Sequence, residues 1–150
     1  MGSTYVDFRG QGFEADDSAL EVWLALLVRE IDKMDQTPAW LRDIRDEWHL
    51  QATAGFGFGV MPGLDRFITD DERRDVILNL SATAILRLER YGAVIPQAEL
   101  NALRTGGEGA TFTRDVPAET FLRTGRYFIK LLQGTLGSNE TDARFEARAS

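Results

Sequence analysis

The strongest constraint on the fold is a helical period of apolar residues that begins near residue 18. The residues on this stripe are Leu20, Trp23, Leu24, Leu27, Ile31 and Met34. A spacing of three or four positions is typical of a helix with one face packed on a core. Asp16 and Asp17 precede the stripe, where the partial positive charge of a helix start favours carboxylates. The sequence therefore predicts a first long helix over about residues 18–34.

Start signals predict two further helices. Thr37 followed by Pro38 gives a cap and a first helical residue whose backbone angle is already set, for a helix that ends near residue 50. Thr69 and Glu72 form a capping box, in which each side chain bonds to the backbone amide of the other residue. The helix that follows this box has a broad apolar arc, so we expect it to be central and packed by several neighbours.

The rest of the sequence predicts two more helices and one short strand pair. Pro96 precedes a short helical pattern, and Asp115 with Pro117 marks the start of a last long helix. Residues 5–8 alternate apolar and polar side chains, which is typical of a short strand, and residues 111–113 are its candidate partner. The sequence thus predicts an all-α fold, an irregular bundle of about five helices with one small two-stranded β pairing at most.

Glycine and proline positions divide this fold. Four glycines and Pro62 lie between positions 55 and 63, which predicts a loop because an interior Gly costs a helix about 1 kcal/mol relative to Ala and Pro about 3. Gly125 lies on the apolar face of the last helix, so another element should approach closely there. We expect one helical domain over residues 1–134. Residues 135–150 have few apolar side chains and predict a mobile or loosely docked tail.

The chain has a single histidine, His49, and no cysteine. The absence of cysteine excludes disulfides and thiolate metal sites and favours a cytoplasmic location. His49 falls on the polar side of its predicted helix, so we expect a solvated rather than a catalytic side chain. The chain has neither an Asp-x-Asp-x-Asp-Gly loop nor a His-x-x-x-His spacing, and no metal or other cofactor is expected. An enzyme is accordingly the less favoured class.

Charge narrows the range of partners. The chain carries 24 acidic and 17 basic side chains, a formal net charge of -7. This balance disfavours nucleic acid, whose phosphates require an excess of Lys and Arg. No apolar run approaches the roughly 18 residues of a membrane helix, so no membrane interaction is expected. A basic protein is the partner that the charge suits.

Candidate partner-binding residues fall into three groups. They are the acidic residues Asp7, Glu14, Asp16, Asp17 and Glu21, the apolar pair Val22 and Leu26, and the basic residues Arg123, Arg126 and Lys130. The acidic group could steer a cationic partner. The apolar pair lies off the main stripe of the first helix, where either an internal neighbour or a partner covers it. The basic group is either a solvated face or a site for an acidic group.

These features favour a non-catalytic acidic interaction protein that binds a basic protein partner. By analogy of class rather than by any motif, it would neutralise that partner as immunity proteins do. Two alternatives stay open. One is a small-ligand-binding protein or a hydrolase that uses carboxylates in a cleft near residues 55–63. The other is a self-associating adaptor, a homodimer whose contact includes Val22 and Leu26.

Overall fold

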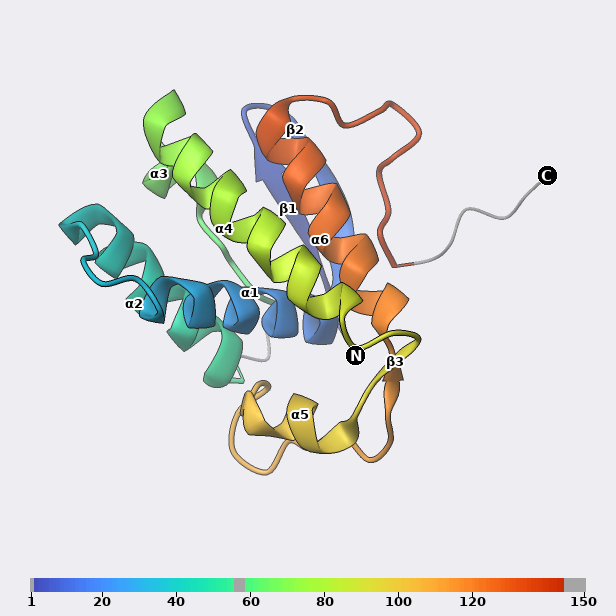
Figure 1. Cartoon of the computed structure of the whole chain (residues 1–150). Helices are drawn as coiled ribbons and strands as arrows, with labels where there is room; N and C mark the ends of the chain where they lie inside the picture. Colours follow the sequence, from blue (N-terminus) through green and yellow to red (C-terminus); the bar gives the residue numbers. More distant parts are fainter. Residues whose placement is uncertain (1, 56–58, 145–150) are drawn as a thin grey trace.

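Helices make up most of the fold, with two small antiparallel strand pairs beside them (Figure 1). The computed structural model describes residues 2–55 and 59–144. Its elements in chain order are β1 (Ser3–Phe8), β2 (Gln11–Asp16), α1 (Asp17–Asp32), α2 (Ala39–Thr53), α3 (Leu64–Phe67), α4 (Asp71–Glu89), β3 (Val94–Ile95), α5 (Gln97–Ala102), β4 (Val116–Pro117) and α6 (Ala118–Gln133). The prediction of a helix-dominated bundle with a small β pairing is confirmed, but the two strand pairs make the fold mixed rather than all-α. Within the described residues, a one-turn helix and a second strand pair are additional to it.

The central element is α1, which packs against α2, α4, α6 and β2. Its predicted stripe is buried except for Met34, which is half-buried just beyond the helix end, and residues on its other sides are buried too, because neighbours cover α1 almost all round. In the core Trp23 of α1 and Trp48 of α2 both meet the ring of Phe128 edge to face, with ring centroids 5.8 and 6.2 Å apart. The indole of Trp48 also donates a 2.8 Å hydrogen bond to the carbonyl of Pro62. This bond fixes the end of the loop that follows α2.

The prediction that the capping-box helix is central was wrong. On α4 the buried residues form a narrow stripe, Ile77, Ser81, Ala84 and Leu88, and α4 covers one side of α1 and α6. The cap is also one residue later than predicted. Asp70, not Thr69, is the N-cap, and its carboxylate accepts a 2.8 Å hydrogen bond from the amide of Arg73. Asp and Thr both suit this position, and the backbone path decides between them.

The strand prediction identified β1 correctly but gave it the wrong partner. β1 pairs with β2 in an antiparallel hairpin, and residues 111–113 form no strand. Arg9 and Gly10 make the turn with φ of 50° and 83°, as tight two-residue hairpins require. Gly12 looks like a strand breaker in the sequence, yet it lies inside β2. A side chain there would meet the ring of Tyr5, since its Cβ would lie 2.6 Å from the ring.

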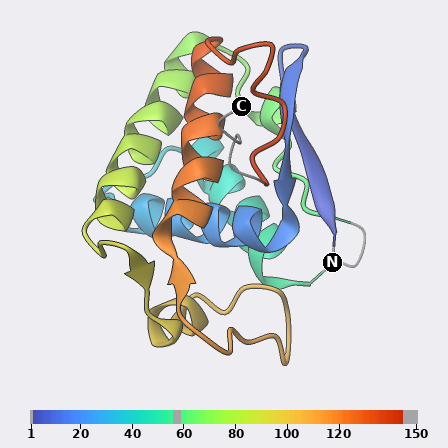
Figure 2. The ribbon, with the colours of Figure 1, turned by 90° about the vertical axis from the view of Figure 1, so that its right-hand side faces the viewer.

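The first part of the predicted tail runs beside the hairpin (Figure 2). The amide of Glu14 donates to the carbonyl of Thr141, and the amide of Ala143 donates to the carbonyl of Glu14, both at 2.8 Å. Leu136 and Ala143 are buried. Residues 145–150 of the tail, like residues 56–58 of the loop after α2, lie outside the described residues.

Gly125 confirms the expected close approach of another element to α6. A Cβ on Gly125 would lie 2.5 Å from the ring of Trp23 and 2.8 Å from Cδ1 of Ile85. Both are closer than van der Waals contact allows, and Trp23 is fully buried. The missing side chain therefore sets how closely α6 packs on α1 and α4.

Gly125→Ala should destabilise the protein. Ala gains roughly 1 kcal/mol of helix propensity, but overpacking a filled core costs about 1–3 kcal/mol, so we expect a net loss of up to about 2 kcal/mol in urea unfolding. The neighbouring Arg126→Ala is the control, because it removes only an exposed ion pair with Glu119. A Gly125→Ala protein at least as stable as the wild type would mean that the contact between α1 and α6 is loose.

Candidate functional site

The antiparallel register gathers three of the predicted acidic residues on one face. Tyr5 lies opposite Glu14, Ser3 opposite Asp16, and Asp7 opposite Gly12. Residues directly opposite in a hairpin project from the same side, while Val6, Phe8 and Phe13 on the other side are buried in the core. We call Tyr5, Asp7, Glu14 and Asp16 the outer hairpin face. Tyr5 is 55% exposed and stands among the three carboxylates.

The charge of the outer hairpin face is partly compensated at one edge. Arg144 of the tail forms a 2.7 Å ion pair with Asp142. The pKa of Arg144 is raised, first by its hydrogen bond to Asp142 and then by the nearby charges of Glu14 and Asp16. Asp7, at the other end of the face, is exposed and has no ion pair with a described residue. The face therefore keeps a net negative charge.

Asp17 and Glu21 lie outside this face. Asp17 accepts a hydrogen bond from the hydroxyl of Thr4 at 2.5 Å. Glu21 is 9% exposed and lines a pocket of about 240 Å³ between α1 and residues 100–112, with Asn101, Arg104 and Thr105 also on its wall. Desolvation, together with the smaller effect of the Asp17 charge, raises the pKa of Glu21 to about 7, although a hydrogen bond from the Gly106 backbone acts in the opposite direction. The predicted acidic residues therefore do not form one site. Three of them lie on the outer hairpin face, Asp17 binds Thr4, and Glu21 is buried.

The predicted basic group contacts the chain's own carboxylates and tail. Arg126 pairs with Glu119 at 3.0 Å on the same helix, and Lys130 pairs with Glu140. Arg123 donates to the carbonyl of Ala143 at 3.4 Å. Two of the three thus hold residues 140–143 against α6, a role that the sequence did not indicate because the tail's path was unknown.

The two residues of the apolar pair, Val22 and Leu26, lie in different surroundings. Val22 is 1% exposed and lines a narrow cavity beside Ile95 and Leu100, so an internal neighbour covers it and it is not a partner surface. This corrects its inclusion among the partner-binding residues. Leu26 is partly buried and forms part of the floor of a groove between α1 and α4.

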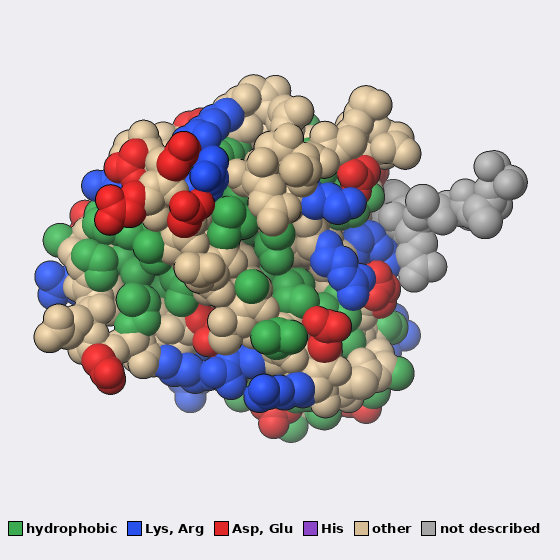
Figure 3. All heavy atoms as spheres, turned by 45° about the horizontal axis from the view of Figure 1, so that its top comes forward, with side chains coloured by type: hydrophobic (Ala, Val, Ile, Leu, Met, Phe, Trp, Pro, Cys, Tyr) green, Lys and Arg blue, Asp and Glu red, His purple; other side chains and the backbone are tan. Residues whose placement is uncertain are grey.

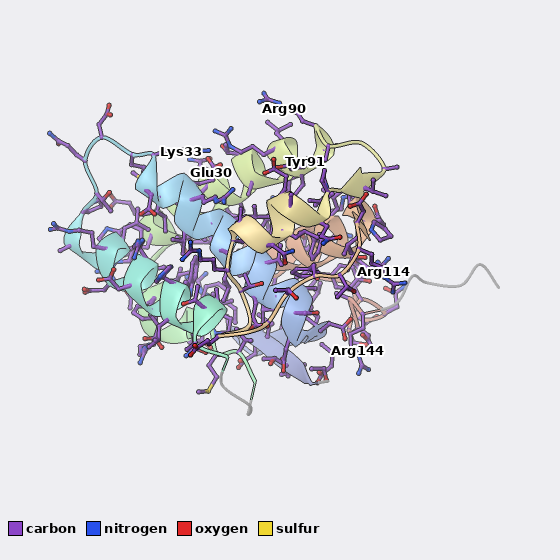
Figure 4. The ribbon with its side chains drawn as sticks, turned by 90° about the horizontal axis from the view of Figure 1, so that it is seen from below. Glu30, Lys33, Arg90, Tyr91, Arg114 and Arg144 are labelled. Atoms are coloured by element: carbon purple, nitrogen blue, oxygen red, sulfur yellow. The ribbon has the colours of Figure 1, made fainter. Side chains whose placement is uncertain are left out.

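That groove was not predicted as a site. Its walls carry Arg29 and Lys33 from the end of α1, and Arg87, Arg90 and Tyr91 from the end of α4 and just beyond, with Glu30 buried between them. Figure 4 shows Glu30 and Lys33 near Arg90 and Tyr91, with Arg114 and Arg144 at a different part of the molecule. The sequence feature that could have indicated this groove was the presence of basic residues near the ends of two separate helices. Their convergence depends on how α1 and α4 cross.

Other kinds of site find little support in the described residues. His49 is exposed on α2, as predicted. In residues 2–55 and 59–144 no group of three or more His, Cys, Asp or Glu side chains is placed to hold a metal ion. None of the helices described there has the length and apolar character needed to span a membrane. On the face drawn in Figure 3, acidic and basic side chains lie in small groups, next to one another in several places, around hydrophobic ones.

No protein-family model matches this sequence, and neither a curated protein nor a solved structure matches it significantly. The case for function therefore depends on the geometry of the hairpin, the Glu21 pocket and the groove between α1 and α4.

The raised pKa of Glu21 predicts a pH-dependent stability. The folded protein holds this proton more tightly than the unfolded chain, so stability is lost as pH rises from about 4.5 to about 7. Glu21→Gln mimics the protonated form and should unfold at a higher temperature than wild type at pH 8 but at the same temperature near pH 4. The shift sets an upper limit of about 3 kcal/mol on the gain, which water in the pocket will reduce.

Thermal unfolding at pH 4, 6 and 8 measures this difference. Glu108→Gln, which removes an exposed glutamate, is the control for the loss of one negative charge. If Glu21→Gln and Glu108→Gln change stability equally at pH 8, the Glu21 carboxyl is not desolvated as described.

Proposed function

We propose that the protein binds another protein of basic character through the outer hairpin face. The observation that carries this proposal is the β1–β2 register, which gathers Asp7, Glu14 and Asp16 around the exposed ring of Tyr5. Exposed aromatic side chains supply much of the binding energy at protein interfaces, and charges around them select the partner. A lysine- or arginine-rich surface is the complementary one.

The charge of the whole chain supports the same partner. A net charge of -7 attracts a cationic protein at long range, and the outer hairpin face then provides the local contact. Such attraction acts mainly on the association rate and weakens as salt screens it, with a screening length of about 8 Å at physiological ionic strength. Association that slows with added salt is the expected signature.

A basic enzyme held inactive by this face would make the protein similar in role to immunity proteins. The proposal includes a cytoplasmic location, for which the absence of cysteine is the supporting feature. The adaptor alternative is less well supported, since Val22 is buried. The hydrolase alternative needs two convergent carboxyls in a desolvated cleft. Asp7 and Asp65 both line a pocket of about 270 Å³ beside residues 60–63, but both side chains are exposed, which gives this alternative less support.

Neutralising the outer hairpin face should abolish partner binding. The test variant is Asp7→Asn/Glu14→Gln/Asp16→Asn, and the matched control, with the same change of charge, is Asp43→Asn/Glu72→Gln/Glu89→Gln, all exposed residues elsewhere. In affinity capture from the native cell extract at low salt, wild type and control should retain a basic protein that the test variant loses. The association rate with that protein should fall on the order of tenfold in the test variant.

Tyr5→Ala provides the second measurement, because truncating an interface aromatic mainly speeds dissociation. A basic partner that binds the test variant and the control equally would contradict the proposal. Sedimentation of the protein alone adds a further check. A dimer that Tyr5→Ala converts to monomer would instead make the outer hairpin face a self-association surface.

A further inference from the structure

The groove between α1 and α4, called here the α1–α4 groove, lies where the last turns of these helices meet. It encloses about 320 Å³, enough for a small organic molecule. Its lining consists of Leu26, Arg29, Glu30, Lys33, Ala84, Arg87, Leu88, Arg90 and Tyr91. Four of these side chains are basic and one is acidic, which leaves three formal positive charges in a chain whose total is negative.

The acidic side chain organises part of this charge. Glu30 is 6% exposed and accepts a hydrogen bond from Nε of Arg87, and Lys33 lies 3.5 Å from the same oxygen. Glu30 accepts a hydrogen bond only from Nε of Arg87, and the two terminal nitrogens of Arg87 have no hydrogen-bond partner among the described residues. Glu30 therefore fixes the Arg87 guanidinium in place and leaves its outer edge available.

The other two cations have no such carboxylate. Within residues 2–55 and 59–144, the side chains of Arg29 and Arg90 form neither a hydrogen bond nor an ion pair, and both are exposed. A further acid, Glu99, lines a small cavity together with Arg29 and Tyr91 and accepts a hydrogen bond from the Tyr91 hydroxyl at 3.5 Å. Burial and the Glu99 charge raise the pKa of Tyr91, so its hydroxyl keeps its proton and adds no negative charge.

Helix ends alone do not require this many cations. A helix C-terminus carries about half a negative charge, so the ends of α1 and α4 together supply about one. Subtracting that from the three formal charges leaves about two positive charges on the groove lining, and the carboxylate of Glu99 beside Tyr91 reduces the excess to about one. A carboxylate, sulfate or phosphate group matches this excess, and arginine can bind each of them through paired hydrogen bonds.

The floor of the groove is apolar. Leu26, Ala84 and Leu88 form it, and Tyr91, 40% exposed, stands at its side. An inorganic ion would leave this floor unused, whereas a ring would bury it and pack beside Tyr91. The cations and the floor together favour a ligand with both a charged and an apolar part.

We propose that the α1–α4 groove binds a small organic anion, in which a phosphate, sulfate or carboxylate is attached to a one- or two-ring apolar body. Arg29 and Arg90 hold the anionic group together with the outer edge of Arg87, and the ring lies on the apolar floor beside Tyr91. Glu30 is a positioning residue, because it acts through Arg87. This site is independent of the outer hairpin face, since it differs in location and in sign of charge.

The probe is 1-naphthyl phosphate, titrated calorimetrically into the full-length protein at low salt. The test variant is Arg29→Gln/Arg90→Gln, and the matched control is Arg42→Gln/Arg114→Gln, two exposed arginines outside the groove with the same loss of charge. We expect wild type and control to bind the probe and the test variant to bind it about tenfold or more weakly. Unfolding temperatures of the three proteins establish that each is folded.

Three further compounds define the chemistry. Naphthalene-1-sulfonate and 1-naphthoate should also bind, while inorganic phosphate and uncharged 1-naphthol should bind much more weakly. Amide NMR shifts should be largest at the ends of α1 and α4. Equal binding to test variant and control, equal binding of 1-naphthol, or no detectable binding of 1-naphthyl phosphate at millimolar concentration would each overturn the proposal.

Discussion

Burial of α1 on nearly all sides is the constraint on which the rest of the structure depends. A helix with one apolar stripe needs one neighbour, whereas α1 is covered by α2, α4, α6 and the hairpin strand β2. The absence of a side chain at Gly125 lets α6 approach Trp23 closely enough to close this shell. The four elements that cover α1 are therefore placed by their fit against it.

Burial of an ionised carboxylate costs free energy, and the two buried carboxylates of α1, Glu21 and Glu30, are stabilised in different ways. Glu30 is compensated by Arg87 and Lys33, because the crossing of α4 brings a guanidinium to it. Within residues 2–55 and 59–144 no cation forms an ion pair with Glu21, and its pKa rises to about 7 instead. The first solution organises a basic groove, and the second leaves a carboxyl that changes its charge near neutral pH.

The two candidate surfaces lie toward opposite ends of the same helix. The outer hairpin face leads into the start of α1, where the helix dipole favours the carboxylates of Asp16 and Asp17. The α1–α4 groove lies at its end, where the dipole favours Arg29 and Lys33. One buried helix thus accounts for the separation of acidic and basic side chains, which net charge alone would not indicate.

The sequence by itself determined the described helices other than the one-turn α3, because their stripes, proline starts and glycine ends act within a few residues. It also determined that His49 is exposed and that Gly125 marks a close contact. The tertiary structure decided what depends on distant neighbours: β2 as the partner of β1, the central place of α1 rather than α4, and Val22 as a buried residue. It also brought Arg123 and Lys130 to the tail and four basic side chains to one groove. Periodicity gives the face of a helix on which a residue lies, but the element that covers that face follows from how the helices cross.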